Sequence, residues 1–411
     1  MSKLDEMIRE LCPDGVEYVK LGTLCSLITK QTGFDYTNHI KARLLMESTE
    51  NAVPYIQTKF FAGKNFNYQT DYYVPMDIVK QFPKITLDKK CILFSIVGAS
   101  IGNVGLFPGE RKCFLGGAIC VAKVLPQYDV DYIYYCVEAH NVQHQIRRKT
   151  KGAGQATITV EDIREFEIPL PPIEVQREIV RILDNFTDLT ADLTADLTAR
   201  QKQYAFYRNK LLTFGKTEGA RIERIPLGDI GSICMCKRIL KSQTNTVSGV
   251  PFYKIGTFGK EADAYISQET FNEYRSKYNF PKKGDVLISA AGTIGRTVVY
   301  DGKPAYFQDS NIVWIDNDES IVLNSYLRYC YELKPWKASE GGTIPRLYND
   351  NIAKTVIAVP SIEEQKRVVS ILDRFDAICN DLTGGLPAEI EARQKQYEYY
   401  RDKLLTFKER G

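Results

Sequence analysis

The feature that most constrains this chain is an internal repeat. The segment ARQKQYAFYRNKLLTF (199–214) returns as ARQKQYEYYRDKLLTF (392–407), with 13 of 16 positions identical. Upstream of each copy lies a second matched pair, LPPIEVQREIVRILDNF (170–186) and VPSIEEQKRVVSILDRF (359–375). Similarity at this level does not arise by chance, so we predict a chain built from two related halves.

Both repeated blocks have the pattern of an amphipathic helix. Apolar residues recur in the first block at steps of mostly three and four, which places them on one helix face: Ile179, Leu183, Phe186, Leu189, Leu193, Leu197, Tyr204, Tyr207 and Leu211. Pro172 precedes this helix, and Ser361 with Glu364 has the S-x-x-E pattern of a capping box before the second. A continuous helix over 173–213 would be about 60 Å long at 1.5 Å per residue. Because no compact domain buries that length, we expect an antiparallel pair with the repeat.

The two helical blocks differ in their middle parts. The first contains DLTA three times in succession (188–199), and the second has DLTGGLPAEIE instead. The DLTA run has the composition of a low-complexity linker, but Leu189, Leu193 and Leu197 continue the apolar stripe, which favours a helical insert. In the second block Gly384, Gly385 and Pro387 predict a break or kink.

The stretch before each helical block has short β-branched and aromatic runs separated by Gly, Pro and Asn, which is typical of a globular domain with strands. The two stretches are faintly related: VPYIQTKFF matches VPFYKIGTF, CILFSIVGASIG matches DVLISAAGTIG, and YIYYC matches YLRYC. We therefore predict an α+β (mixed α/β) fold with two pseudo-repeated globular domains separated by two long antiparallel helices. The expected boundaries are 1–167, 168–215, 216–356 and 357–411.

Basic residues gather in a few short stretches, although the net charge is only +3. Candidates for binding nucleic acid are Arg147, Arg148, Lys149 and Lys151 in the first half, and Lys237, Arg238, Lys241 and Arg346 in the second. Asn103 and Arg296 each follow a glycine pair, in GASIG and GTIG, that predicts a tight loop able to approach DNA. Ordinary solvated surface and plain turns are the alternatives.

Fragments that imitate catalytic motifs do not meet the requirements of those motifs. Gly215-Lys216-Thr217 lacks the earlier glycine of a phosphate-binding loop, and His140 with His144 lacks the glutamate of HExxH. The amino-methyltransferase signature, Asn or Asp followed by Pro-Pro and an aromatic residue, is missing too. We therefore expect no catalytic residue, no metal site and no cofactor in this chain.

The cysteine content and the apolar runs of the sequence indicate the cellular compartment of the protein. The ten cysteines are scattered without a CxxC pair, which favours buried, reduced thiols. No apolar run reaches the roughly 18 residues of a membrane span, and the first 15 residues lack the apolar stretch of a signal peptide. We expect a cytoplasmic protein without membrane contact.

The order of variable domain, repeated helix, variable domain and repeated helix, with LPPIEVQREIV and ARQKQYAFYRNKLLTF in the helices, resembles the specificity subunit of type I restriction-modification enzymes over essentially the whole chain. The resemblance implies that each globular domain is a target recognition domain reading one half of a bipartite, asymmetric site in double-stranded DNA. It implies that the helices are spacers docking two modification (methyltransferase) subunits, and that restriction subunits complete the complex. S-adenosylmethionine, ATP and Mg, with adenine methylation and ATP-dependent cleavage, would then belong to partner subunits.

Two further expectations concern the helices. The repeated ends carry more apolar surface than one helix pair can cover, so we expect partner docking there, through Tyr204, Phe206, Tyr207 and Leu211 and through Tyr397, Tyr399, Tyr400 and Leu404. The resemblance also implies that four-residue repeats such as DLTA set the gap between half-sites. Two other functions stay open from the sequence: a two-headed adaptor for proteins or glycans, and a fused methyltransferase-nuclease.

Overall fold

The computed structural model describes residues 3–33, 35–150, 156–214, 222–336, 346–381 and 383–410. The chain divides into two compact units, Met1–Leu193 with Ile390–Gly411 (unit 1) and Thr194–Glu389 (unit 2). Each unit therefore combines one globular domain with parts of both repeated helical blocks. Because the units cut through those blocks, the four boundaries expected from the sequence stay a prediction.

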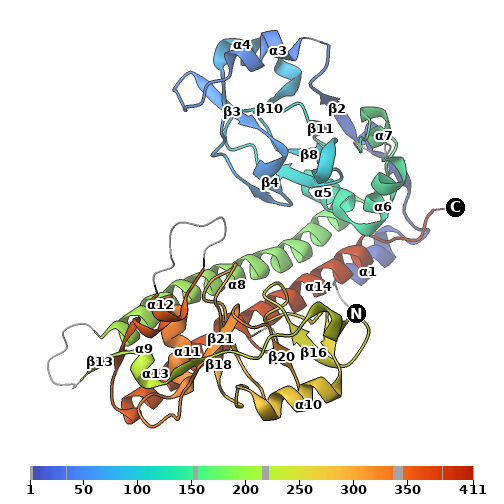
Figure 1. The fold of residues 1–411 in the computed structure, drawn as a ribbon. Helices are drawn as coiled ribbons and strands as arrows, with labels where there is room; N and C mark the ends of the chain where they lie inside the picture. Colours follow the sequence, from blue (N-terminus) through green and yellow to red (C-terminus); the bar gives the residue numbers. More distant parts are fainter. Residues whose placement is uncertain are drawn as a thin grey trace. The chain divides into compact units, whose positions relative to one another are not determined.

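The first repeated block forms one continuous helix, α8 (Ile173–Thr213) of 41 residues, drawn in green in Figure 1. The DLTA run lies within it, so the prediction of a helical insert is confirmed. The predicted apolar stripe is only partly covered, however: Leu189 is exposed, and Leu197 packs against the core of unit 2.

The second repeated block is broken, as its glycines predicted. It forms α13 (Ile362–Asn380) and α14 (Leu386–Leu404), the orange and red helices of Figure 1. A Cβ atom on Gly385 would lie 2.5 Å from the carbonyl oxygen of Ala377, closer than such atoms pack, so the turn requires glycine. At the start of α13 the Ser361 hydroxyl accepts a hydrogen bond from the Glu364 amide, but the Glu364 carboxylate accepts from Arg367, so only half of the expected capping box is seen.

The helical segments within unit 2 run antiparallel, as expected. The ring of Tyr207 stacks on that of Phe375 with centroids 5.9 Å apart. Cys379 lies four residues later than Phe375 in α13; burial raises the pKa of its thiol, and Arg200, seven residues earlier than Tyr207 in α8, opposes that rise. Contacts that advance along one helix while they retreat along the other define an antiparallel pair.

Unit 1 contains two four-stranded sheets in the orders β6-β3-β10-β7 and β2-β11-β8-β9, with the small pairs β1-β12 and β4-β5. Its strands are β1 (Tyr18–Lys20), β2 (Cys25–Lys30), β3 (Ala52–Ile56), β4 (Phe61–Ala62), β5 (Asn65–Phe66), β6 (Tyr73–Pro75), β7 (Thr86–Leu87), β8 (Cys91–Ser95), β9 (Val104–Phe107), β10 (Cys113–Leu115), β11 (Ile119–Val124) and β12 (Glu167–Pro169). Its further helices are α1 (Lys3–Leu11), α2 (Leu21–Leu24), α3 (Tyr36–His39), α4 (Met76–Gln81), α5 (Val130–Glu138), α6 (His140–Lys149) and α7 (Val160–Arg164).

Unit 2 has a similar plan with the sheets β14-β21-β18-β19 and β15-β17-β16-β20 and the pair β13-β22, but its edge strand β15 lies beside β17, whereas β7 of unit 1 lies beside β10. Its strands are β13 (Glu223–Pro226), β14 (Ser232–Cys234), β15 (Thr244–Asn245), β16 (Val250–Tyr253), β17 (Tyr265–Ile266), β18 (Val286–Ser289), β19 (Thr297–Val299), β20 (Tyr306–Phe307), β21 (Ile312–Asp316) and β22 (Val356–Val359). Its further helices are α9 (Leu227–Ile230), α10 (Gln268–Lys277), α11 (Asn324–Glu332) and α12 (Asn349–Ala353).

Unit 1 is completed by a segment that comes from the other end of the sequence. The Val16 amide donates to the carbonyl of Lys408, and the Arg410 amide donates back to Val16. Gly15 allows this contact, since a Cβ there would lie 2.6 Å from the Lys408 carbonyl oxygen. Residues 408–410 thus form a backbone bridge with the segment that precedes β1.

The cysteines are free, and eight of the ten are buried, which confirms the expected buried thiols. Burial raises the pKa of the Cys136 and Cys330 thiols to about 12. Of the helices that the structure describes, none combines the length and the apolar character needed to cross a membrane.

Candidate functional site

The two glycine loops of the predicted site have the same backbone frame. In unit 1 the Ser95 amide donates to the Asn103 carbonyl at 2.9 Å, and in unit 2 the Ser289 amide donates to the Arg296 carbonyl at 2.9 Å. The glycines Gly98, Gly102, Gly292 and Gly295 all have positive φ angles, from 66° to 86°. Each loop is therefore a tight turn, and Asn103 and Arg296 occupy equivalent positions in it.

A second segment lies beside each loop and is equivalent in the two units. Val97 forms an antiparallel bridge with Thr157, and Ala291 forms one with Arg346. The bridge is followed by an equivalent hydrogen bond in each unit. The Ile158 amide donates to the Ile96 carbonyl, and the Leu347 amide donates to the Ala290 carbonyl. Thr157 and Arg346 consequently stand at the same place on the two domains.

The first basic cluster lies at the end of α6. Arg147 and Arg148 are exposed and Lys149 is partly exposed in the last helical turn, while Lys151 lies outside the described residues. The glycine loop is seated on this helix, because the Gln143 side chain donates to the Gly102 carbonyl at 3.3 Å. The structure thus brings the loop that carries Asn103 to the helix that carries the basic cluster.

The candidates in unit 2 lie on several segments. Lys237, Arg238 and Lys241 are exposed on the loop that follows β14. Arg296 is only partly exposed, and its guanidinium donates to the Phe258 carbonyl at 2.8 Å, so part of its donor capacity supports the fold. Arg346 is exposed, and its Nη2 donates to Oδ1 of Asn311 at 3.0 Å.

An open depression of about 580 Å³ lies beside Arg346. It is lined by Met235, Ser310, Arg346, Leu347, Tyr348, Asn349, Asp350 and Asn351. Arginine, asparagine, serine and aspartate are among the side chains that make hydrogen bonds to base edges in DNA grooves. Met235 lies two residues before Lys237, so this depression borders the segment of the second basic cluster.

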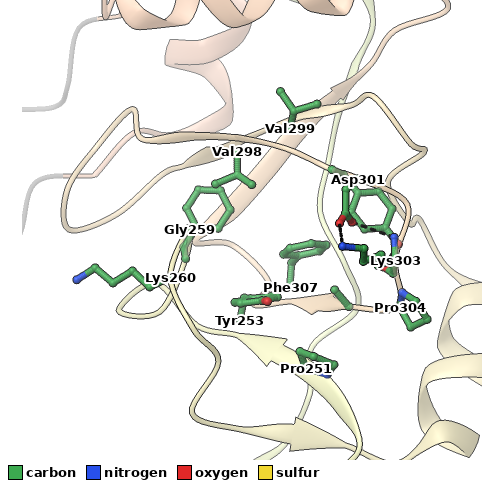
Figure 2. A pocket seen from close by; sticks show the side chains of 13 residues that line it. Pro251, Tyr253, Gly259, Lys260, Val298, Val299, Asp301, Lys303, Pro304 and Phe307 are labelled. Carbon is green, nitrogen blue, oxygen red and sulfur yellow. Dashed lines mark hydrogen bonds and ion pairs between the residues drawn. The ribbon is translucent and has the colours of Figure 1, made fainter. Parts of the chain in front are cut away.

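A different pocket of about 350 Å³ lies in the same domain and is shown in Figure 2. Its walls are largely apolar, with Tyr253, Phe258 and Phe307 among the lining side chains. Asp301 and Lys303 at its edge are joined by an ion pair of 3.3 Å, marked by a dashed line. These two polar groups therefore pair with each other.

The two histidines at helical spacing in α6 stack, with ring centroids 6.4 Å apart. Within the part of the chain that the structure describes, they are not joined by a third histidine, cysteine, aspartate or glutamate in a metal-binding group.

The helix residues expected to dock a partner fall into two groups. Phe206 and Tyr399, which are equivalent in the repeat, are each 62% exposed, and their neighbours Tyr207 and Tyr400 are 38% and 36% exposed. Leu211 and Leu404 are partly exposed. The docking role of these six residues stays a prediction.

Tyr204 and Tyr397 are instead buried in their own units, at 7% and 6% exposure. The Tyr204 hydroxyl donates to Glu332 at 2.9 Å, and the Tyr397 hydroxyl donates to Glu138 at 2.5 Å. Burial, reinforced by the neighbouring carboxylate, raises the pKa of both phenols. These side chains attach the helices to the globular domains, so they are not available as a docking surface in this structure.

The joint between helices and domains extends to residues that the sequence analysis did not single out. The Tyr135 hydroxyl of α5 donates to Asp184 of α8, and the equivalent Tyr329 hydroxyl of α11 donates to Asp373 of α13. The match of YIYYC with YLRYC was the signal that could have found these tyrosines. The same match places Glu138 and Glu332 two residues after each motif, so the repeat could have found both carboxylates but not their tyrosine partners, which lie 259 and 128 residues away.

The sequence model of the family described as Type I restriction modification DNA specificity domain matches residues 13–200 and 221–392. A chain of Haemophilus influenzae described as a type I restriction enzyme specificity subunit is 56% identical over 264 residues, which are 62% of this chain and 68% of that one. The specificity subunit of the Escherichia coli type I restriction enzyme EcoR124I/EcoR124II is 31% identical over 271 residues, 59% of this chain and 63% of that one.

Solved structures agree on the fold. A chain from a study of complex assembly in a type I restriction-modification system has a TM-score of 0.62 at 18% identity and is covered over 97% of its length. The S subunit of such a system from M. genitalium has a TM-score of 0.53 at 16% identity, with 95% of the present chain covered. These matches confirm the α+β class with two domains and a long helix. The family model and the two relatives support the specificity-subunit interpretation, and not the two-headed adaptor or the fused methyltransferase-nuclease.

Proposed function

Because the chain belongs to the type I restriction-modification DNA specificity family, we propose that it is the DNA-recognition subunit of such a complex. Each globular domain reads one half of a bipartite, asymmetric site, and the helices set the gap and dock two modification subunits. Methylation and cleavage, with S-adenosylmethionine, ATP and Mg, take place on the partner chains. Restriction subunits join the complete assembly.

The observation that carries this proposal is the pair of equivalent glycine loops with different side chains. The backbone frames agree in their hydrogen bonds, yet Asn103 corresponds to Arg296 and Thr157 to Arg346. A constant frame with exchanged polar side chains is what two readers of different short sequences require, since base edges are distinguished by hydrogen bonds from side chains. The basic turn at the end of α6 supplies charge for phosphate contacts beside one of these loops.

The test is the salt dependence of DNA binding by the chain co-purified with its modification subunit, measured on a pool of randomised duplex DNA. Replacing Arg147, Arg148, Lys149 and Lys151 by alanine should weaken binding and flatten the plot of log affinity against log salt, by about 0.9 for each phosphate that is no longer neutralised. The matched control replaces four other exposed lysines of the same domain, Lys80, Lys84, Lys89 and Lys112.

The control variant should keep the slope of the parent complex. Equal flattening in both variants would show a general effect of net charge and would remove the α6 turn from the interface. Absence of duplex binding by the parent complex would contradict the proposed function itself.

A further inference from the structure

We propose that Arg346, oriented by Asn311, reads a base in the half-site of the second domain and sets its sequence preference. This inference rests on the proposed function and adds to it a specificity-determining residue and a positioning residue. The base expected from the chemistry is guanine, since a guanidinium donates two parallel hydrogen bonds to the O6 and N7 atoms of that base.

The backbone of Arg346 and of the residue after it is tied to the glycine loop. Arg346 itself is bridged to Ala291 of the glycine loop, and the Leu347 amide donates to the Ala290 carbonyl at 2.8 Å. Leu347 is buried and so anchors the segment, whereas Arg346 is exposed. An exposed arginine on a backbone segment that is tied to the loop is the arrangement that precise recognition needs.

The guanidinium is held as well as the backbone. Nη2 of Arg346 donates to Oδ1 of Asn311 at 3.0 Å. Asn311 is in turn tied to the same loop, because its carbonyl accepts from the Ala290 amide at 2.7 Å. This contact uses one N–H of the guanidinium and limits its rotation, so less conformational freedom is lost when the arginine meets a base.

The surroundings of Arg346 suit a base edge better than a phosphate alone. The adjoining depression presents Ser310, Asn349 and Asn351 together with the 55% exposed ring of Tyr348. Asp350 is the acidic member of this lining. A carboxylate disfavours phosphate but accepts a hydrogen bond from the amino group of cytosine, the partner of guanine in the duplex.

The equivalent place in unit 1 lacks this pair. The bridge position of Arg346 is occupied by the exposed Thr157, and the residue whose carbonyl accepts from the loop amide is Ala118 in place of Asn311. An alanine cannot orient a neighbouring side chain by a hydrogen bond, and a threonine makes one such bond with little discrimination. The same frame therefore gives the two domains different preferences at this point.

The experiment is methylome sequencing of a host that expresses the chain with its modification subunit, comparing the parent chain with Arg346→Lys and Asn311→Ala. Arg346→Lys keeps the charge and loses the two-pronged donor, so the preference for guanine at one position should fall about 10- to 100-fold. Asn311→Ala should relax the same position to a smaller extent. The matched control is Arg275→Lys, at an exposed arginine of α10, which should leave the motif unchanged.

Relaxation confined to one position of one half-site, and the same position in both variants, supports the assignment. Thermal unfolding of each purified variant identifies a loss that comes from the fold, and Asn311→Asp, which keeps an acceptor at the same place, should then restore the preference. An unchanged motif in both Arg346→Lys and Asn311→Ala, or relaxation spread over both half-sites, overturns it. A parent chain that directs no sequence-specific methylation would contradict the proposed function rather than the role of Arg346.

Discussion

Unit 1 and unit 2 attach their globular domains to the helices by the same hydrogen bonds, but they differ at the exposed positions of the glycine loops. Gln176 and Gln365, both buried, donate to the carbonyls of Pro171 and Pro360 and accept from the amides of Asp129 and Leu323. The pairs that differ at the loops are Asn103 with the partly exposed Arg296, and Thr157 with Arg346. The two units therefore share the scaffold that joins domain and helix and differ on a surface where specificity can vary.

The scaffold also differs between the units in one respect. In unit 1 Lys64, from the turn between β4 and β5, makes ion pairs with Asp131 of α5 and Asp184 of α8, and its ammonium lies 4.5 Å from the centre of the Tyr135 ring. In unit 2 the corresponding joint uses Arg328, which lies on α11 itself and pairs with Asp376. The cation at this place thus comes from the turn between two strands in unit 1 and from α11 in unit 2.

The largest effect is expected from deleting one DLTA unit, Asp192–Ala195, because the division between the units falls within it. The deletion leaves the hydrogen bonds of both joints in place. It removes roughly 6 Å of helix and about 400° of rotation, and the rotation left after one full turn is close to the 34–36° of one DNA base pair. We expect methylation of the original site to be lost and the gap to shorten by one base pair.

Methylome sequencing of the deletion strain measures both half-sites and the gap. Unaltered half-sites would show that each unit reads independently of the other. An unchanged gap would contradict the ruler role of the repeat, and altered half-sites would show that the two units are not separable readers. Reduced methylation of the shortened site is expected from the helix length in excess of one base-pair rise.

An intermediate effect is expected for the buried glutamines. Gln365→Leu leaves the carbonyls of Pro360 and Ile321 and the amide of Leu323 without their partners, which should lower the free energy of unfolding by about 2–4 kcal/mol. Gln176→Leu removes two such bonds and should cost less. Hydrogen exchange should show reduced protection in α11 for the first variant and in α5 for the second. If either variant changed the exchange of α5 and α11 equally, the two attachments of domain to helix would not be independent.

The smallest effect is expected for the two buried tyrosines. Tyr204→Phe and Tyr397→Phe each remove one hydrogen bond to a carboxylate, so each should lower the free energy of unfolding by about 1–2 kcal/mol near neutral pH. Because the pKa of both phenols is raised in the folded state, the parent chain loses stability as the pH rises above about 10, where the unfolded tyrosine ionises. The difference between parent and variant should therefore shrink from pH 8 to pH 10.5 in thermal unfolding, and a constant difference would remove ionisation from the explanation.

Much of the fold could be predicted from the sequence, because the helical period and the internal repeat are both visible in the order of the residues. The steps of three and four residues predicted α8, and Gly384, Gly385 and Pro387 predicted the break between α13 and α14. The joints were less accessible, since Tyr397 meets Glu138 through a contact across 259 residues that leaves no local pattern.

In the candidate site, too, local features could be predicted from the sequence and tertiary contacts could not. The glycine spacing predicted the tight loops and the equivalence of Asn103 with Arg296, because those depend on local backbone geometry. The burial of Tyr204 and Tyr397 was not predicted, since an aromatic residue on an amphipathic helix faces either its own domain or a partner, and periodicity does not distinguish the two. Asn311 has no sequence signal, because its role depends on a tertiary contact with Arg346.

The backbone bridge between Val16 and residues 408–410 bears on the order in which the protein folds during synthesis. Unit 2 is one uninterrupted stretch of chain, Thr194–Glu389, whereas unit 1 needs Ile390–Gly411 in addition to its first 193 residues. On the ribosome the carboxylate of Glu138 therefore has no hydrogen bond from Tyr397, and the core around Val175 and Ile179 lacks Leu405, until the second unit has been synthesised. The domain that is translated first is the one that is completed last.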